Sequence, residues 1–203
     1  TDLVEGHGSV GSRSLFVGGN AILRGIEDFL EECKQLAASE LEASVEDLEY
    51  HQGNFQVKGT RVGIGIFDLC SRQSDNSISV KRKKELTGRS WPNGCHVAEV
   101  EIDAETGEVR LDRYVSVDDV GNTVNPMIVH GQVQGGIASG LGQAVLERTE
   151  YDASGQLLSG SYMDYALPRA DDMPSLSGSL FEKAPCLTNP LGAKGTGEIG
   201  AVA

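Results

Sequence analysis

The strongest helical pattern in the sequence lies between residues 21 and 38. Apolar side chains recur there at intervals of three and four residues, and charged side chains occupy the opposite face. The apolar positions are Ile22, Ile26, Phe29, Leu30, Cys33, Leu36 and Ala37. Asn20 precedes them and is a residue type that caps helix N-termini. The pattern predicts an amphipathic helix from Ala21 to about Ala38, with a solvent-exposed acidic face.

A second helix is predicted from Asn125-Pro126, an N-cap followed by proline at the first helical position, to about Glu147. Five glycines stand inside it, and each costs about 1 kcal/mol relative to alanine. A stripe without bulky side chains is formed by Gly131, Gly135, Ser139 and Gly142. This stripe indicates either close packing against another element or close approach to a ligand, with Gln132 offering its amide near the start of the helix.

Strand patterns fill much of the remaining chain. The segment from Leu48 to Lys58 predicts two strands around Gln52-Gly53-Asn54, and a short helix follows from Ile66 to about Arg72. Further strands are predicted from Leu157 to Tyr165 and from Ser175 to Glu182.

The clearest hairpin joins residues 97–103 to residues 109–118 through the turn Glu105-Thr106-Gly107. Apolar and acidic residues alternate in its first strand, which places Ala98, Val100 and Ile102 on one face. The order of helix, strands, helix and strands predicts an α+β fold with a mostly antiparallel sheet and two main packing helices. No internal repeat or long linker is visible.

Composition excludes several classes of function. The chain has 203 residues and a net charge of −13, which argues against nucleic acid and anionic membrane as partners. No apolar run approaches the roughly 20 residues of a membrane-spanning helix. The short basic run at 81–84 is interpreted as a solvated loop. The N-terminus does not resemble a signal peptide, and the absent initiator Met suggests a fragment or a processed chain.

Four cysteines stand at positions 33, 70, 95 and 186, without the spacing of a zinc knuckle. They are predicted to be reduced thiols, which favours a cytoplasmic location. Cys95 and His96 are disfavoured as a nucleophilic pair, because neighbours on a strand point to opposite faces.

Candidate chemistry concentrates in the segment Asn189–Gly200, which holds four glycines, one lysine and one carboxylate. So many glycines indicate backbone that bends sharply or approaches another group closely. Residues 195–200 match the G-x-G-x-x-G pattern, but only three residues remain after Gly200, so the helix of a dinucleotide fold does not follow. Lys194 precedes Gly195 rather than serine or threonine, which excludes a P-loop. Glu198 remains as a candidate base.

Seven short motifs in this order resemble the molybdenum-binding large subunit of the xanthine dehydrogenase, aldehyde oxidase and carbon monoxide dehydrogenase family. They are Gly11-Ser12-Arg13-Ser14, Pro92-Asn93-Gly94, Val117-Asp118-Asp119-Val120-Gly121, Asn125-Pro126, Gly131-Gln132-x-x-Gly135-Gly136, Met163-Asp164-Tyr165-x-x-Pro168-Arg169-Ala170-Asp171, and Asn189-Pro190-Leu191-Gly192-x-Lys194-Gly195-x-Gly197-Glu198. The resemblance covers essentially the whole chain, whereas subunits of this family are several times longer. It implies that residues 1–203 are a fragment of the second molybdopterin-binding domain, cut at both ends.

The resemblance also implies a cofactor, which is molybdopterin with molybdenum, often as the cytosine dinucleotide. Gly11, Ser12, Arg13 and Ser14 would supply donors to its phosphates and pterin. Gln132 matches the family glutamine near the molybdenum centre, and Glu198 matches the catalytic glutamate. Lys194, Gly195 and Gly197 share the loop of that base and are assigned to cofactor binding. Lys194 either helps to set the charge of Glu198 or contacts carbonyls in the loop. Gln134 departs from the family pattern, since many relatives carry histidine there.

The implied function is that of a molybdenum hydroxylase, which hydroxylates an aldehyde or N-heterocycle or oxidises carbon monoxide. Glu198 would act as the base that takes the proton of the attacking hydroxyl. Electrons would leave through iron–sulfur clusters and FAD in partner subunits, and the remainder of the large subunit would complete the site. One alternative is a non-catalytic binding or interaction domain that retains the fold and is inactive as an isolated chain. Another is an unrelated hydrolase that uses Glu198 or Cys95 and His96. The substrate is not readable from this sequence.

Overall fold

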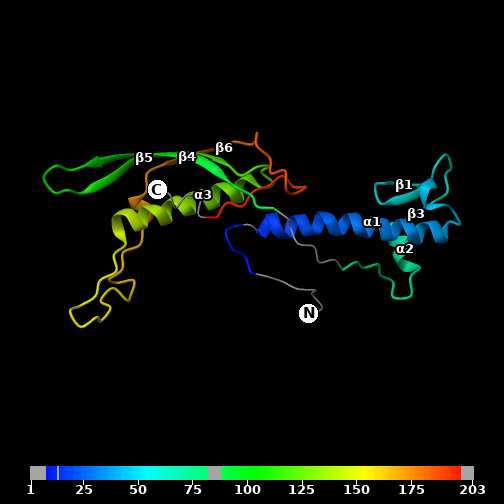
Figure 1. The fold of residues 1–203 in the computed structure, drawn as a ribbon, viewed down its shortest axis with the longest axis horizontal. Coiled ribbons are helices and arrows are strands. Elements are labelled where there is room, and N and C mark those ends of the chain that lie inside the picture. Colours follow the sequence, from blue (N-terminus) through cyan, green and yellow to red (C-terminus); the bar gives the residue numbers. More distant parts are fainter. Residues whose placement is uncertain (1–7, 13, 82–87, 198–203) are drawn as a thin grey trace. The chain divides into compact units, whose positions relative to one another are not determined.

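The computed structural model describes residues 8–12, 14–81 and 88–197 (Figure 1). This part of the chain divides into two compact units. The first unit comprises residues 19–81, and the second comprises residues 8–12, 14–18 and 88–197. Each unit has its own sheet, helix and hydrophobic cluster, and each is described by itself.

The first unit is built along helix α1 (Asn20–Glu40). Its antiparallel sheet has the strand order β1 (Leu48–His51), β2 (Asn54–Val57) and β3 (Gly63–Gly65), and helix α2 (Ile66–Ser71) follows directly. Figure 1 shows the sheet and α2 beside the C-terminal half of α1. The buried cluster between these elements consists of Cys33, Ala37, Ala38, Leu48, Phe55, Ile64 and Leu69.

The predicted elements of this unit are largely confirmed. The β1–β2 turn is made by Gln52 and Gly53, whose φ angles of 45° and 88° match the left-handed pair that a tight hairpin turn requires. Two details were wrong. Asn20 is the first residue of α1 rather than its cap, because a π-helical turn at Leu15–Gly19 leads into the helix. Ile22 is 65% exposed, because the sheet and α2 of this unit pack only against the later turns of α1.

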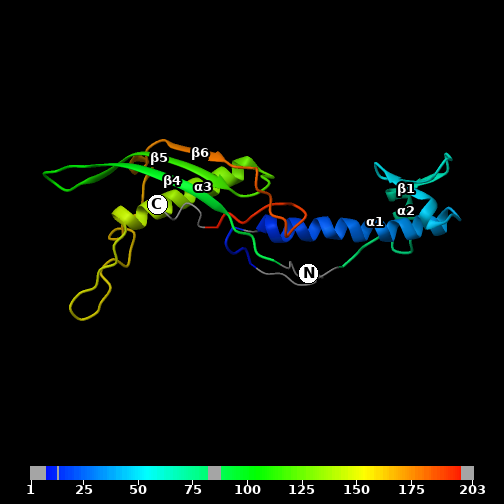
Figure 2. The ribbon, with the colours of Figure 1, turned by 45° about the horizontal axis from the view of Figure 1, so that its top comes forward.

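The second unit holds a three-stranded sheet covered by one helix. Strand β4 (Asn93–Ile102) pairs antiparallel with β5 (Val109–Asp119), and β5 pairs with β6 (Leu176–Leu180). Helix α3 (Pro126–Leu141) runs along the sheet, as Figures 1 and 2 both show, and ends in a π-helical turn at Gly142–Leu146. The cluster between helix and sheet consists of Tyr114, Val133 and Ile137, with Leu111, Val129, Met173 and Leu176 packed around it.

The hairpin of β4 and β5 and the start of α3 are confirmed. The side chain of Asn125 accepts a hydrogen bond from the amide of Ile128 at 3.2 Å, as expected for an N-cap that is followed by proline. The predicted α+β class with mostly antiparallel pairing is also confirmed. The exception is the pairing of β5 with β6, which is parallel.

Val100 and Ile102 are 51% and 61% exposed, as is most of β4, whose register with β5 shifts between Glu99 and Val100. One prediction in this unit was wrong. The segment from Leu157 to Tyr165 is not a strand; it makes one isolated bridge, between Tyr151 and Leu157. The carbonyl of Ser161 accepts hydrogen bonds from Asp164 and Tyr165, so the chain turns there.

No helix within the described residues is both long and apolar enough to cross a membrane. All four cysteines are free thiols, as predicted.

Candidate functional site

The loop at residues 186–197 folds back onto the end of β5. The amide of Lys194 donates to the carbonyl of Val120 at 2.8 Å, and Gly121 forms an antiparallel bridge with Ala193. The carbonyl of Gly192 accepts two hydrogen bonds, from the amide of Asn122 at 3.0 Å and from that of Cys186 at 2.8 Å. The loop is therefore held by backbone contacts, not by a hydrophobic core.

Two glycines make this close approach possible. Gly121 and Gly192 have φ angles of +69° and +66°, in the left-handed region that residues with a Cβ rarely adopt. A Cβ added to Gly121 would overlap the carbonyl oxygen of Gly192, and one added to Gly192 would overlap the side-chain amide of Asn122. The glycines therefore set the distance between strand end and loop.

Side chains add to the anchoring of the loop. The amide of Asn122 donates to the carbonyl of Leu191 at 2.9 Å, and that of Asn189 donates to the carbonyl of Ala193 at 3.0 Å. Nζ of Lys194 lies 2.5 Å from Oδ2 of Asp119, and the two side chains are 10% and 11% exposed. The side chain of Lys194 therefore ties the loop to Asp119, the last residue of β5.

The N-terminal segment meets the same loop. Gly11 and Ser12 both have left-handed φ angles, of 61° and 50°. A Cβ on Gly197 would lie 2.5 Å from the Cα of Gly11, so the two backbones pass against each other at a point where only glycine fits. The hydroxyl of Ser12 donates to Oε1 of Gln132 on α3. Segments that are 120 residues apart in sequence thus meet at one place.

A cavity of about 530 Å³ lies where these segments converge. Hydroxyl and amide groups and one ammonium group line it, together with aliphatic side chains. The polar lining residues are Ser9, Ser12, Ser14, Asn122, Asn125, Gln132, Lys194 and Thr196. The aliphatic ones are Leu15, Val120, Val124, Ile128, Val129 and Ala193. Such a wall suits a large polar organic group better than a bare ion.

The structure brings together most of the residues that the sequence singled out. Ser12, Ser14, Gln132 and Lys194 line the cavity. Gly11 and Gly197 lie beside it through their mutual contact, and Gly195 donates its amide to the hydroxyl of Ser90 at 3.4 Å. Arg13 and Glu198 lie outside the described residues.

Sequence reasoning missed several lining residues and one partner. Ser9 and Thr196 lie one to three positions from predicted site residues, so a wider window around each motif would have included them. Asn125 was identified as a helix cap and as part of a family motif, but not as a residue that lines the site. The pairing of Asp119 with Lys194, which are 75 positions apart, has no local sequence signal.

Cys186 is a buried thiol at the base of the loop. Its Sγ lies 3.1 Å from the hydroxyl of Thr188. Burial raises the pKa of this thiol, but hydrogen bonds from Thr188 and Asn189 and the charge of Lys194 outweigh it, so the pKa is lowered overall.

His96 does not pair with Cys95, as predicted from their adjacent positions on a strand. Cys95 is exposed, whereas the imidazole of His96 faces Tyr114 and Asp118 on β5. Burial, and then the charge of Asp118, raises the pKa of the Tyr114 hydroxyl.

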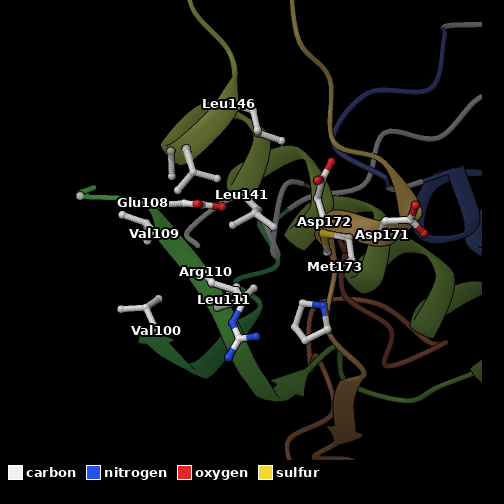
Figure 3. A pocket seen from close by; sticks show the side chains of 14 residues that line it. Val100, Glu108, Val109, Arg110, Leu111, Leu141, Leu146, Asp171, Asp172 and Met173 are labelled. Carbon is white, nitrogen blue, oxygen red and sulfur yellow. The ribbon is translucent and has the colours of Figure 1, made fainter. Parts of the chain in front are cut away.

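A larger cavity, of about 720 Å³, lies elsewhere in the second unit (Figure 3). Its wall has Val109, Leu111 and Leu141 on one side and Met173 on the other. Charged side chains at its margin are Glu108, Arg110, Asp171 and Asp172. It contains none of the predicted site residues, whereas the smaller cavity is lined by four of them, so the smaller cavity is the candidate site. Within the described residues, no group of three His, Cys, Asp or Glu side chains is placed to hold a metal ion.

Comparison with known proteins finds relatives along the whole chain. The model of the molybdopterin cofactor-binding domain family matches residues 1–174. The gamma subunit of the 6-hydroxypseudooxynicotine dehydrogenase complex from Paenarthrobacter nicotinovorans is 33% identical over 213 residues, which cover 100% of this chain and 27% of that protein.

Two solved structures share the fold. Reconstituted CO dehydrogenase from Oligotropha carboxidovorans has a TM-score of 0.80 and 29% identity, over 97% of this chain and 25% of that one. Quinoline 2-oxidoreductase from Pseudomonas putida 86 has a TM-score of 0.75 and 32% identity, over 98% of this chain and 26% of that one. The chain thus spans about a quarter of the length of the relatives that it matches.

The expected likeness to a molybdopterin-binding domain is therefore confirmed. The chain belongs to the molybdopterin cofactor-binding domain family, which is part of molybdenum-dependent oxidoreductases related to xanthine dehydrogenase and carbon monoxide dehydrogenase.

Proposed function

We propose that residues 1–203 are a segment of the second molybdopterin-binding domain of a molybdenum hydroxylase, with Glu198 as the catalytic base. The observation that carries this proposal is the convergence of three distant segments on one cavity that contains most of the predicted cofactor-binding side chains. These segments are residues 9–15, the span from Val120 to Gln132, and the loop that leads to Glu198.

The residues around the cavity fit a pterin cofactor with phosphates. A Cβ on Gly197 would overlap the backbone of Gly11, whereas a Cβ added to Gly11 meets no described atom within 4 Å, so Gly11 leaves open space beside its backbone for a bulky polar group. The hydroxyls of Ser9, Ser12 and Ser14 line the same wall, and that of Ser9, which accepts a hydrogen bond from Ser14, keeps its own proton for a phosphate or pterin oxygen. Arg13, which stands between Ser12 and Ser14 in sequence, would add a guanidinium for a phosphate of the dinucleotide form.

When bound, such a cofactor supplies the two-electron redox chemistry. The chain's own residues supply orientation and proton transfer. Gln132 accepts a hydrogen bond from Ser12 through Oε1, an arrangement that directs its Nε2 donor to another acceptor. The carboxylate of Glu198 would take up the proton of the hydroxyl that attacks the substrate carbon. Lys194, Gly195 and Gly197 complete the loop that carries this carboxylate.

The names of the relatives indicate different substrates, namely 6-hydroxypseudooxynicotine, carbon monoxide and quinoline. We therefore propose the reaction class, namely hydroxylation of an aldehyde or N-heterocycle or oxidation of carbon monoxide, and leave the individual substrate open. The proposed partners are the remainder of the large subunit and iron–sulfur and flavin subunits that remove electrons. The proposed location is the cytoplasm, where the four free thiols stay reduced.

The test is Glu198→Gln in the full-length enzyme. Turnover is expected to fall by about 10² to 10⁴, the range for loss of a general base, while molybdenum content by mass spectrometry stays unchanged. Turnover like that of the wild type would overturn the assignment of the base.

A second measurement separates this proposal from a non-catalytic binding domain. Gln132→Ala in the full-length enzyme is expected to reduce turnover, and Ser12→Ala to reduce cofactor content. A full-length protein that is purified without molybdenum or pterin, in a host that supplies both, would favour the non-catalytic alternative.

A further inference from the structure

The two carboxylate oxygens of Asp119, the last residue of β5, contact different groups. Oδ1 accepts a hydrogen bond from the amide of Gly121 at 2.9 Å and so shapes the turn after the strand. Oδ2 lies 2.5 Å from Nζ of Lys194, in the loop that runs to Glu198. One side chain therefore joins the end of a strand to the loop of the proposed base.

We propose that Asp119 and Lys194 are a positioning pair, in which Lys194 anchors the loop instead of binding the cofactor. This inference rests on the proposed function, because Glu198 is the group to be positioned. With both side chains about one-tenth exposed, water and salt screen the pair weakly. The ammonium charge is matched by the carboxylate, so Lys194 offers little net charge to an anionic group in the cavity.

The backbone of Lys194 is fixed by the same strand end. Its amide donates to the carbonyl of Val120 at 2.8 Å, and its neighbour Ala193 bridges Gly121. Both the side chain and the main chain of Lys194 are therefore held by residues 119–121.

This anchor fixes the start of the segment that leads to the proposed base. Lys194 precedes Glu198 by four residues in sequence, and four residues of chain span at most about 14 Å. Gly197 is restricted further by its contact with the backbone of Gly11. Because a displacement of about 1 Å at a reacting group costs about a hundredfold in rate, a loosened anchor lowers turnover without removing the base.

The experiment compares Asp119→Asn, Lys194→Met, Lys194→Arg and Glu198→Gln in the full-length enzyme. Asp119→Asn keeps an oxygen for the amide of Gly121 and loses the charge. We expect kcat to fall by about a hundredfold in Asp119→Asn and Lys194→Met, with KM changed by less than about threefold and molybdenum content retained. Lys194→Arg restores most of the rate, because a guanidinium still pairs with the carboxylate.

Hydrogen exchange gives a readout that does not depend on turnover. The amide of Lys194 is expected to exchange about tenfold faster in Asp119→Asn and Lys194→Met than in the wild type, since the contact that keeps it closed is weakened. The control is the exposed pair of Arg110 and Glu101, 69% and 68% exposed, whose removal leaves both readouts unchanged.

The results of these experiments either support or overturn the positioning pair. Unchanged kcat and exchange in Asp119→Asn and Lys194→Met would overturn the positioning pair. Loss of molybdenum in Lys194→Met alone would also overturn it and assign Lys194 to cofactor binding. Full turnover in Glu198→Gln, together with faster exchange of the Lys194 amide in Asp119→Asn and Lys194→Met, would support the anchor and overturn the assignment of the base.

Discussion

Nε2 of His96 lies 2.8 Å from Oδ1 of Asp118, and the two side chains are 9% and 1% exposed. The other ring nitrogen lies 3.0 Å from the hydroxyl of Tyr114, so the imidazole is held at both ends. A Cβ on Gly94 would lie 2.7 Å from the same carboxylate oxygen. The glycine of the Pro92-Asn93-Gly94 motif therefore makes room for this buried carboxylate.

We expect His96→Ala to destabilise the chain by about 3 kcal/mol, because the carboxylate of Asp118 loses a partner while it stays buried. Urea unfolding followed by circular dichroism measures this change. His96→Gln keeps a donor and is expected to cost less. The contrasting variant is Glu101→Ala, which removes an exposed pair and costs at most about 1 kcal/mol. Equal stability of His96→Ala and the wild type would show that Asp118 is not buried as the geometry indicates.

Gly121→Ala is expected to be one of the most damaging single substitutions in the second unit. The left-handed φ angle alone costs an alanine about 1 to 2 kcal/mol, and the overlap with the carbonyl of Gly192 adds to it. Gly107→Ala is the matched control, since its φ angle is +75° and no atom lies within 4 Å of its added Cβ. Thermal unfolding of both variants should therefore separate steric overlap from backbone strain. Similar losses in the two variants would contradict the close approach.

Gly135→Ala tests the two explanations of the glycine stripe on α3. A Cβ there meets nothing within 4 Å among the described residues, and Gly135 is exposed. Alanine is favoured over glycine in a helix by about 1 kcal/mol, so we expect the isolated chain to gain stability. A loss of stability in urea unfolding would indicate that another element covers this face. In the full-length enzyme, a drop in cofactor content would favour close approach of the ligand.

Cys33 makes the stability of the first unit depend on pH in the alkaline range. Burial, then the charges of Cys70 and Glu32, raises the pKa of its thiol from 9.0 to about 11. The unfolded thiol ionises first, so the folded state binds more protons between these values. The stabilisation is complete below pH 9 and is lost as the pH rises through about 11, a change of about 2 to 3 kcal/mol at 1.4 kcal/mol per pKa unit.

Urea unfolding of the wild type and of Cys33→Val at pH 8 and pH 10.5 measures this contribution. The difference between the two proteins isolates Cys33 from the lysines and tyrosines that ionise in the same range. Identical pH dependence in the two proteins would contradict the raised pKa.

Much of the fold follows from local chemistry. The turn residues Gln52 and Gly53, the cap at Asn125 and the hairpin at residues 97–118 were predictable because each depends on neighbouring residues. The bulge at Glu99 and Val100 was not, since the alternating pattern continues through it and the register depends on how β5 twists against β4. The start of α1 was not predictable either, because a π-helical turn at Leu15–Gly19 leads into the helix and has no periodic signal in the sequence.

The sequence by itself determined the helices, the principal hairpin and the family, because periodicity, turn chemistry and short motifs are local properties of a chain. It also singled out Ser12, Gln132 and Lys194 as candidate site residues, although it did not show that they line one cavity. Only the tertiary structure decided that Asp119 pairs with Lys194 and that Gly121 lies against Gly192. These contacts join residues about 70 positions apart, and they form only where the turn after β5 brings the loop back onto the strand end.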